Sequence, residues 1–387
     1  MSYAEHRRII DVDSHLIELD DFLVRAARPS ERPHIPSISE QRQLPVSSEA
    51  MDRARQHLDR RRQDPDVMAR FEASLLDNRR SGWSRLGAFD PEERSHTLDL
   101  LGFEKQLILP TFAFHQVAQV QNSTAKEIST RVLNRAMGQF CQADPRLFAI
   151  GYVPLELGPE RASELIEQAF EDHCYSLMVD TNQPDPKARS FTHPDYDIVW
   201  DLFARRQTPF VVHVAVNGKY EAVSRSFHNN GRPTIELGGD AATSPLGFVT
   251  IKNSAELFLS AMIFDGVFDR HPRLQGLSME HGAFWVPSWL HALDFTAQSL
   301  RRISPMDRVP SEIAREHLRF SPFAGEPVGW IIENIGPDML VFASDYPHPE
   351  GTSDPIRKFE ATMSQCDEKT MNAFYYGNMA ATMGISD

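Results

Sequence analysis

Hydrophobic residues in this chain gather in short runs, and longer stretches with helical periodicity separate most of them. Short apolar runs bounded by polar or turn residues predict buried strands. Eight such runs are present: Ile9–Val12, Gln106–Pro110, Leu147–Pro154, Ser176–Asp180, Phe210–Val216, Leu274–Met279, Leu318–Ser321 and Met339–Ala343. The helical stretches include Pro159–Asp172, Ile198–Arg206, Asn253–Arg270 and Phe284–Leu300. This alternation predicts an α/β protein made of βα units, and eight units favour a closed (β/α)8 TIM barrel over an open sheet.

Two segments interrupt the alternation. Residues 19–95, which are charged and helical in pattern, follow the first strand, and residues 218–245, rich in Gly, Asn, Ser and Thr, follow the fifth. Insertions after strands lie at the carboxyl-terminal mouth of a barrel, so we expect both to form lids or pocket walls. Neither an internal repeat nor a low-complexity linker divides the chain, and we therefore expect one barrel domain over residues 1–387.

The composition of the chain says more about its possible binding partners than about its fold. The formal net charge is −14, and so acidic a surface repels phosphate backbones, which argues against a nucleic acid partner. The arginine-rich stretch Asp52–Arg62 carries acids at helical spacing and indicates a solvated helix face. The chain lacks an uncharged apolar run of about 18 residues, so we expect no membrane span. Three widely spaced cysteines and a charged start without an apolar leader favour the cytoplasm.

Acidic and histidine side chains follow several of the predicted strands. Asp13 and His15 come after the first strand at a spacing that points both side chains to one face. His213 lies in the fifth strand, His281 follows the sixth, and Asp345 follows the eighth. Because the carboxyl ends of barrel strands share one rim, we expect these five residues to converge.

Each of these residues also has a structural interpretation. His213 alone could be a buried core histidine, and Asp13 or Asp345 could accept backbone N–H bonds in a turn. Their common position at strand ends favours a metal site. Imidazole and carboxylate ligands suit zinc, iron or manganese, so we expect one or two divalent ions.

At this point the sequence resembles the amidohydrolase superfamily, in particular the amidohydrolase-related branch that includes aminocarboxymuconate semialdehyde decarboxylase and the resorcylate decarboxylases. The resemblance covers most of the chain outside the two insertions. The stretches that carry it are Ile10–Glu18, Leu98–Pro110, Phe140–Pro154, Glu280–Asp294 and Phe342–Gly351.

The resemblance implies a role for each candidate. Asp13 and His15 become the metal pair of the first strand, and His213 becomes a ligand from the fifth. Asp345 becomes a catalytic carboxylate that binds metal and often accepts a proton. His281 is then either a ligand of a second metal or a catalytic acid or base.

Two departures from the family pattern change the expected site. The first motif of the family is commonly His-x-His or sometimes Glu-x-His, whereas this chain has Asp13 and His15. Many relatives end the fourth strand with Arg-Pro-Asn or with a carboxylated lysine, whereas this chain reads Val179-Asp180-Thr181-Asn182. Asp180 could bridge two ions about 3.5–4 Å apart. It could also bind a cationic substrate group or cap a helix.

Several further side chains are expected at the barrel mouth. Asn182, His348 and Trp285 are our candidates for substrate contact, whereas His115 and His228 fit solvated loops better. Aromatic bulk near the mouth favours an apolar or aromatic small-molecule substrate, although most of these rings are expected in the core. They are Phe103, Phe112, Phe114, Phe284, Trp285 and Trp289.

Three reactions fit this site. The first is hydrolysis by a metal-activated water, with Asp345 as the base. The second is decarboxylation of an aromatic or unsaturated acid, which the lack of a strand-four arginine weakens. The third is hydroxylation of an apolar metabolite by a diiron monooxygenase. Fold analogy favours hydrolysis. A non-enzymatic binding protein is the remaining alternative, and a homodimer is the default assembly.

Overall fold

The computed structural model describes residues 2–37, 45–77, 82–214, 216, 223–232, 244–348 and 351–385. Within this part of the chain, seven strands form one parallel sheet in sequence order, so each strand pairs with the next. The strands are β1 (Ile10–His15), β2 (Lys105–Leu109), β3 (Leu147–Val153), β4 (Cys174–Val179), β5 (Phe210–His213), β6 (Gly276–Met279) and β7 (Leu318–Phe320). Each overlaps a predicted strand, which confirms the parallel α/β arrangement.

The eighth predicted strand, Met339–Ala343, is not a regular strand, but it closes the barrel. Leu340 forms an isolated parallel bridge to Phe320 of β7. Further along, Tyr346 forms a parallel bridge to Ser14 of β1, and the N–H of Val12 donates to the carbonyl of Phe342 at 3.0 Å. The segment thus bonds to both edges of the curled sheet. The TIM barrel prediction is confirmed, with an irregular eighth position.

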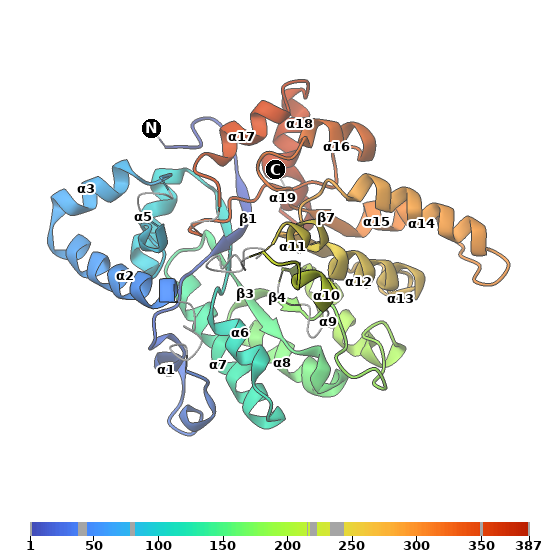
Figure 1. The fold of residues 1–387 in the computed structure, drawn as a ribbon, viewed down its shortest axis with the longest axis horizontal. Helices are drawn as coiled ribbons and strands as arrows, with labels where there is room; N and C mark the ends of the chain where they lie inside the picture. Colours follow the sequence, from blue (N-terminus) through green and yellow to red (C-terminus); the bar gives the residue numbers. More distant parts are fainter. Residues whose placement is uncertain are drawn as a thin grey trace.

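Helices surround the sheet, which lies at the centre of the molecule in Figure 1. After β2 and β3 come α6 (Ala113–Gln119), α7 (Ser123–Cys141), η4 (Leu155–Leu157) and α8 (Pro159–Glu171). After β4 and β5 come η5 (Pro194–Tyr196), α9 (Asp197–Arg206), α10 (Arg225–His228), α11 (Pro245–Thr250), α12 (Asn253–Phe264) and α13 (Val267–Arg270). The remaining helices are α14 (Val286–Leu300), α15 (Pro310–His317), α16 (Val328–Ile335), α17 (Pro355–Thr362), α18 (Glu368–Asn372), η6 (Ala373–Gly377) and α19 (Asn378–Thr382). The predicted helices between strands are therefore confirmed, with small shifts at their ends and with the stretch Asn253–Arg270 divided into α12 and α13.

The first insertion is helical, as expected. It contains α1 (Phe22–Ala26), η1 (Arg32–His34), α2 (Pro45–Gln63), α3 (Pro65–Ala73), η3 (Gly82–Ser84) and α5 (Pro91–Leu101). One part of the prediction for α2 is wrong: Arg61 is only 2% exposed and pairs with Glu93 at 2.8 Å instead of lying on a solvated face. The pair is stable there because the Arg61 guanidinium also donates to the carbonyl of Ser84.

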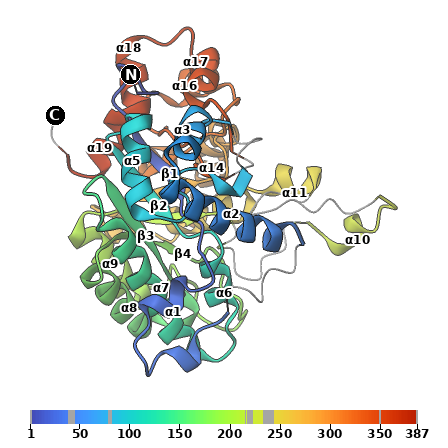
Figure 2. The same cartoon turned by 90° about the vertical axis from the view of Figure 1, so that its left-hand side faces the viewer.

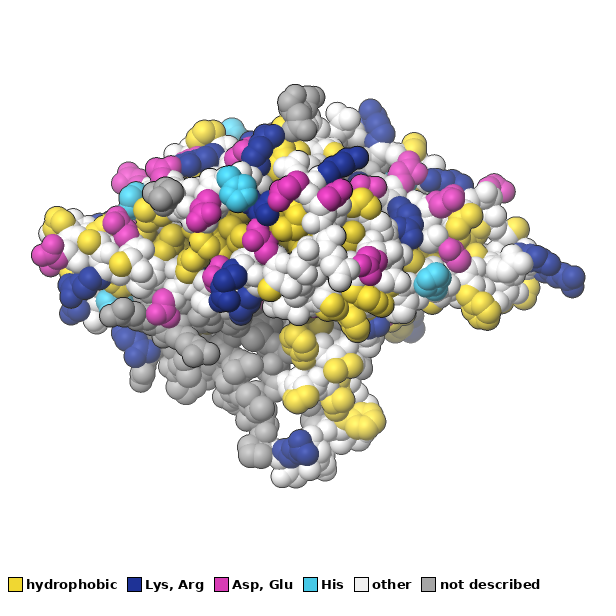
Figure 3. Space-filling model, turned by 90° about the horizontal axis from the view of Figure 1, so that it is seen from above, with side chains coloured by type: hydrophobic (Ala, Val, Ile, Leu, Met, Phe, Trp, Pro, Cys, Tyr) yellow, Lys and Arg dark blue, Asp and Glu magenta, His cyan; other side chains and the backbone are white. Residues whose placement is uncertain are grey.

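Part of the second insertion projects from the barrel. In Figure 2, α10 and α11 extend away from the body of the molecule, and Figure 3 shows hydrophobic side chains on this projection. Phe227, Phe248 and Val249 are among its exposed residues. Residues 217–222 and 233–243 of the insertion, and the side chain of His228, lie outside the description.

One helical stretch in the described ranges, Pro245–Phe264, is long and apolar enough to cross a membrane. Helices buried in a protein core can have the same length and hydropathy. The second part of this stretch, α12, packs Ala255, Leu259 and Ile263 into the core around the barrel.

Candidate metal centre

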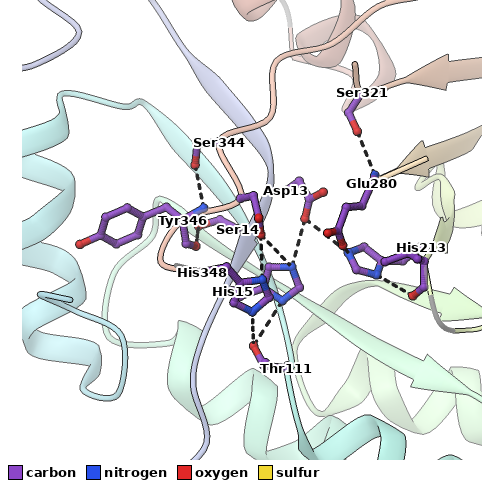
Figure 4. Close-up of polar contacts among 12 residues, drawn as sticks. Asp13, Ser14, His15, Thr111, His213, Glu280, Ser321, Ser344, Tyr346 and His348 are labelled. Carbon is purple, nitrogen blue, oxygen red and sulfur yellow. Dashed lines mark hydrogen bonds and ion pairs between the residues drawn. The ribbon is translucent and has the colours of Figure 1, made fainter. Parts of the chain in front are cut away.

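A row of alternating carboxylates and imidazoles lies at the carboxyl-terminal ends of the strands (Figure 4). At one end, Oε2 of Glu280 lies 3.2 Å from Nε2 of His213. The same His213 nitrogen lies 3.6 Å from Oδ1 of Asp13. Oδ1 of Asp13 in turn lies 3.2 Å from Nε2 of His15. Three elements, β1, β5 and the end of β6, therefore contribute to this half of the row.

The row continues onto the segment that closes the barrel. Nε2 of His15 lies 3.9 Å from Oδ1 of Asp345, and this oxygen lies 2.8 Å from Nδ1 of His348. The rings of His15 and His348 stack at a centroid distance of 4.0 Å. His348, which we expected near the substrate, is thus buried within the row itself.

The local backbone explains why these side chains converge. Asp13 and His15 are two residues apart on β1, so their side chains share one face of the strand. Asp345 and Glu280 both have left-handed backbones, with φ values of 55° and 59°. This conformation is uncommon outside glycine and turns a side chain away from the alternation of a strand. Both residues are therefore directed by special turns rather than by strand register.

Glu280 was missed by the sequence interpretation, which chose its neighbour His281. In a regular strand, adjacent residues face opposite sides, so choosing one excludes the other. The left-handed Glu280, followed by Gly282 at φ 66°, breaks that rule. The sequence Glu-His-Gly directly after a strand could have indicated Glu280, because a glycine at this position often marks a turn.

His281 lies close to the row but belongs to a different environment. It is buried, Nδ1 is 3.1 Å from the hydroxyl of Ser278, and Nε2 has no hydrogen-bond partner among the described residues. Burial, followed by the charge of His213, lowers the pKa of His281 to about 3. The imidazole is therefore neutral at physiological pH, which suits a ligand or hydrogen-bonding group better than an acid.

Two neighbouring imidazoles stabilise the ionised form of Asp13. Burial alone would raise its pKa, but hydrogen bonds and charge from His15 and His213 outweigh burial and lower the pKa well below its usual range. Its carboxylate is only 2% exposed. An ionised, buried carboxylate beside two imidazoles is the form that binds a metal cation.

A turn after β2 supports the imidazoles from behind. The hydroxyl of Thr111 lies 2.9 Å from Nε2 of His348 and 3.5 Å from Nδ1 of His15, and donates to the carbonyl of Leu16. The turn is held by the buried carboxylate of Glu18, which accepts N–H bonds from residues 111, 112 and 113. Contacts of this kind fix the orientation of ligand imidazoles.

A cavity of about 380 Å³ opens beside the row. Asp13, Glu280 and Asp345 line its polar side. Phe248 and Phe323, which stack at 5.3 Å, line its apolar side. Lys358 of α17 is the basic residue among the described lining residues. The cavity thus offers a small ligand three carboxylates of the row, an aromatic wall and a cation.

The structure does not bring Asp180 together with the other predicted ligands. Its two oxygens accept hydrogen bonds from the hydroxyl of Tyr152 and the N–H of Leu155, both at 2.9 Å. Asp180 and Asn182 instead line a separate cavity of about 430 Å³ with Tyr152. Burial raises the pKa of Asp180 to about 7. Asp180 lines this cavity and not the one beside the row, so a strand-end position alone did not place this residue in the row.

Trp285 is also placed differently from our expectation. It is 8% exposed, donates from Nε1 to the carbonyl of Gly282, and packs against Trp289 and Phe320. It does not line the described cavities beside the row or beside Asp180. Its role is therefore in the core.

The residues of the row fit a divalent ion. Two groups of three side chains offer ligand atoms within 4.8 Å of one another: Asp13, His15 and His213, and His15, Asp345 and His348. Ligand distances near 2.0–2.2 Å place opposite ligands of one ion roughly 4 Å apart. Each group is therefore compact enough to hold an ion with small side-chain adjustments.

Comparison with solved structures supports the fold. An amidohydrolase from Mycobacterium avium subsp. paratuberculosis K-10 has a TM-score of 0.72 and 19% identity, over 98% of this chain and 99% of that one. A 5-carboxyvanillate decarboxylase from Sphingomonas paucimobilis has a TM-score of 0.61 and 19% identity over the same shares. The 5-carboxyvanillate decarboxylase of Novosphingobium aromaticivorans DSM 12444, complexed with manganese and 4-hydroxy-3-methoxy-5-nitrobenzoic acid, has a TM-score of 0.67. It is 16% identical, with 98% of this chain and 97% of that chain covered.

The family comparison covers nearly the whole sequence. The model of the amidohydrolase family matches residues 10–384, from the start of β1 to beyond α19. The match includes every residue of the alternating row. The chain therefore belongs to the amidohydrolase family.

Proposed function

We propose that this chain is a divalent-metal-dependent decarboxylase that acts on a small aromatic or unsaturated carboxylic acid. The observation that carries the proposal is the cavity of about 380 Å³, which combines Asp13 and Asp345 of the metal centre, an aromatic pair and Lys358. Structural similarity to decarboxylases of aromatic acids supports the same reaction. Our sequence interpretation placed hydrolysis first, and these observations favour its decarboxylase alternative instead.

The metal would be held by Asp13, His15, His213 and Asp345. A bound divalent ion polarises the oxygens that it contacts, and zinc, manganese and iron all accept this ligand mixture. The manganese in the Novosphingobium enzyme supports manganese as the first ion to test. Thr111 orients the imidazoles, and the stacked phenylalanines shield one face of the substrate from water.

Lys358 supplies the cation that the chain lacks at the end of β4. We expected the loss of the family's arginine there to weaken carboxylate binding. Lys358 instead lines the cavity beside the row, from α17, and a lysine ammonium pairs with a carboxylate as a strong, charge-assisted hydrogen bond. It is therefore our candidate for holding the substrate carboxylate.

Loss of carbon dioxide requires a proton for the carbon that carried the carboxylate. We assign this proton to Asp345, which lines the cavity. Nδ1 of His348 lies 2.8 Å from Oδ1 of Asp345 and can return a proton to it. The neutral His281 then serves as a nearby hydrogen-bonding group.

The test is carbon dioxide release from a panel of hydroxylated benzoates and unsaturated acids by the manganese-loaded enzyme. Replacing Lys358→Met should raise KM roughly 10-fold or more with a smaller effect on kcat, because a charged hydrogen bond contributes about 1.5–3 kcal/mol. Lys369→Met, on α18, removes a matched lysine that does not line the cavity and should leave KM unchanged. Hydrolysis of amides, esters or lactones without carbon dioxide release would overturn the proposal.

The composition of the row favours a second candidate function, hydroxylation by dioxygen. Three carboxylates and three imidazoles alternate along it, and mixed ligation of this kind suits a pair of irons. This reaction would require iron and an external reductant. Oxygen consumption coupled to substrate hydroxylation, seen only in the iron-loaded enzyme, would favour it over decarboxylation.

A further inference from the structure

The turn that carries Asp345 needs support from its surroundings. Asp345 has a left-handed backbone, with φ 55°, and such a conformation persists in a residue with a side chain only where neighbouring groups enforce it. The N–H of Asp345 donates to the carbonyl of Asp13 at 2.9 Å, and the N–H of His348 donates to the carbonyl of Asp345 at 2.9 Å. Further contacts to this turn come from the first insertion.

A short segment of that insertion, residues 83–86, contacts the turn. The hydroxyl of Tyr346 donates to the carbonyl of Leu86 at 2.6 Å. The ring of Trp83 lies edge-on to the ring of His348, with the centroids 5.8 Å apart. In Figure 4, the ring of Tyr346 points away from the row. The insertion is therefore packed against the residues that follow the acid in the chain.

Arg85 is the charged residue of this segment. Its guanidinium lies over the ring of Tyr346, with Cζ 4.2 Å from the centroid, and Nη1 donates to the carbonyl of His348 at 3.5 Å. Nη2 donates to the carbonyl of Leu75, within the insertion, at 3.0 Å. The positive charge of Arg85 also attracts the carboxylate of Asp345. Arg85 thus joins the insertion to the turn and to the charge of its acid.

The environment of Arg85 differs from that of a paired structural arginine. Arg85 is buried, both of its described hydrogen-bond acceptors are backbone carbonyls, and its Nε has no hydrogen-bond partner among the described residues. Arg61, which is equally buried in the same insertion, pairs with Glu93 through Nε and Nη2. Burial of a guanidinium without a carboxylate in contact is costly. Arg85 is therefore better explained by the turn that it holds than by a gain in stability.

We propose that Arg85 is a positioning residue for proton transfer, and that it holds the turn so that the carboxylate of Asp345 faces the cavity. Asp345 lines the cavity of about 380 Å³, whereas Arg85 is not among its described lining residues. Arg85 therefore acts through Asp345 and not on the substrate. The inference rests on the proposed function, because that function assigns the proton to Asp345.

The experiment compares the steady-state kinetics of Arg85→Met and wild type, at saturating Mn²⁺, on the acid that the wild type decarboxylates fastest. Arg85→Met should lower kcat about 10–100-fold, the usual effect of removing a group that orients a reactive side chain. KM should stay near the wild-type value, because we assign the substrate carboxylate to Lys358, on α17. Arg85→Lys keeps a cation for the ring of Tyr346 and should recover part of the lost kcat.

Arg135→Met is the matched control. Arg135 is a buried arginine of α7 that also joins the first insertion to the barrel, through the carbonyl of Ala26 and the carboxylate of Glu31. This variant should keep the wild-type kcat. The same kcat in Arg85→Met and Arg135→Met would overturn the positioning role. A raised KM with unchanged kcat in Arg85→Met would overturn it as well, because Arg85 would then bind the substrate.

Hydrogen exchange separates this inference from the proposed function. Peptides that cover residues 339–348 should exchange faster in Arg85→Met than in Arg135→Met or the wild type, because the turn loses contacts. Unchanged exchange would overturn the inference. A wild type that releases no carbon dioxide from the panel would overturn the proposed function, and hydrogen exchange would still decide whether Arg85 holds the turn. If circular dichroism shows that Arg85→Met does not fold, Tyr346→Phe, which loses the bond to Leu86, takes its place in both measurements.

Discussion

At the scale of single residues, backbone conformation decides which side chains reach the candidate metal centre. Glu280 and Asp345 reach it from left-handed positions, and Asp13 and His15 reach it through strand alternation. Asp180 also follows a strand, but its oxygens are held by Tyr152 and Leu155. Position along the chain was therefore sufficient to place some candidate ligands and misleading for others.

The separate environment of Asp180 predicts a pH effect on stability. Burial raises its pKa from 3.8 to about 7, so the folded protein keeps a proton that the unfolded chain releases above about pH 4. Its contribution to the free energy of unfolding therefore falls as the pH rises from about 4 to 7, by up to about 4 kcal/mol. Asp180→Asn does not titrate. Urea unfolding at pH 4.5 and 7.5 measures the effect. The free energy of unfolding of Asp180→Asn, relative to wild type, should be higher at pH 7.5 than at pH 4.5. The same difference at both pH values would refute the raised pKa of Asp180.

The sequence alone predicted much of the centre for a physical reason. Parallel strands share one rim, so Asp13, His15, His213 and Asp345 were expected together, and the structure brings them together in one row. Glu280 was missed because its left-handed backbone is a local feature that hydrophobic periodicity does not report. Trp285 was misplaced because aromatic residues near a rim serve the core as readily as the pocket.

At the scale of elements, the turn between β2 and α6 sets the geometry of the imidazoles. Glu18 accepts three backbone N–H bonds from this turn, and Thr111 then contacts His15 and His348. The periodicity predicted β2 correctly but could not identify this support, because it depends on a contact between residues more than 90 positions apart.

Removing the hydroxyl of Thr111 tests this support. Thr111→Val preserves the side-chain shape but loses the contact with Nε2 of His348, so the affinity for Mn²⁺ should fall about 10–100-fold. Thr181→Val is a matched control, because Thr181 is a buried threonine after β4 that bonds to the carbonyl of Val216 instead. Titration calorimetry with Mn²⁺ measures both. Equal affinities in the two variants would show that the turn does not orient the ligands.

At the scale of the whole molecule, the candidate metal centre lies where the barrel closes. The segment from Met339 to Tyr346 bonds to β7 and to β1, and the N–H of Asp345 donates to the carbonyl of Asp13 at 2.9 Å. Because its backbone is irregular, this segment forms isolated bridges in place of regular strand pairing, but it places Asp345 and His348 against β1. The hydrophobic pattern predicted a regular eighth strand. The structure has an irregular segment there, and it leads into the turn at Asp345.

The most direct test of this account is anomalous diffraction from crystals of the full chain soaked with Mn²⁺. We expect strong peaks within ligand distance, about 2.0–2.3 Å, of the row that runs from Glu280 to His348. A protein that binds manganese only at other sites, with none beside Asp13 and His15, would contradict the central claim.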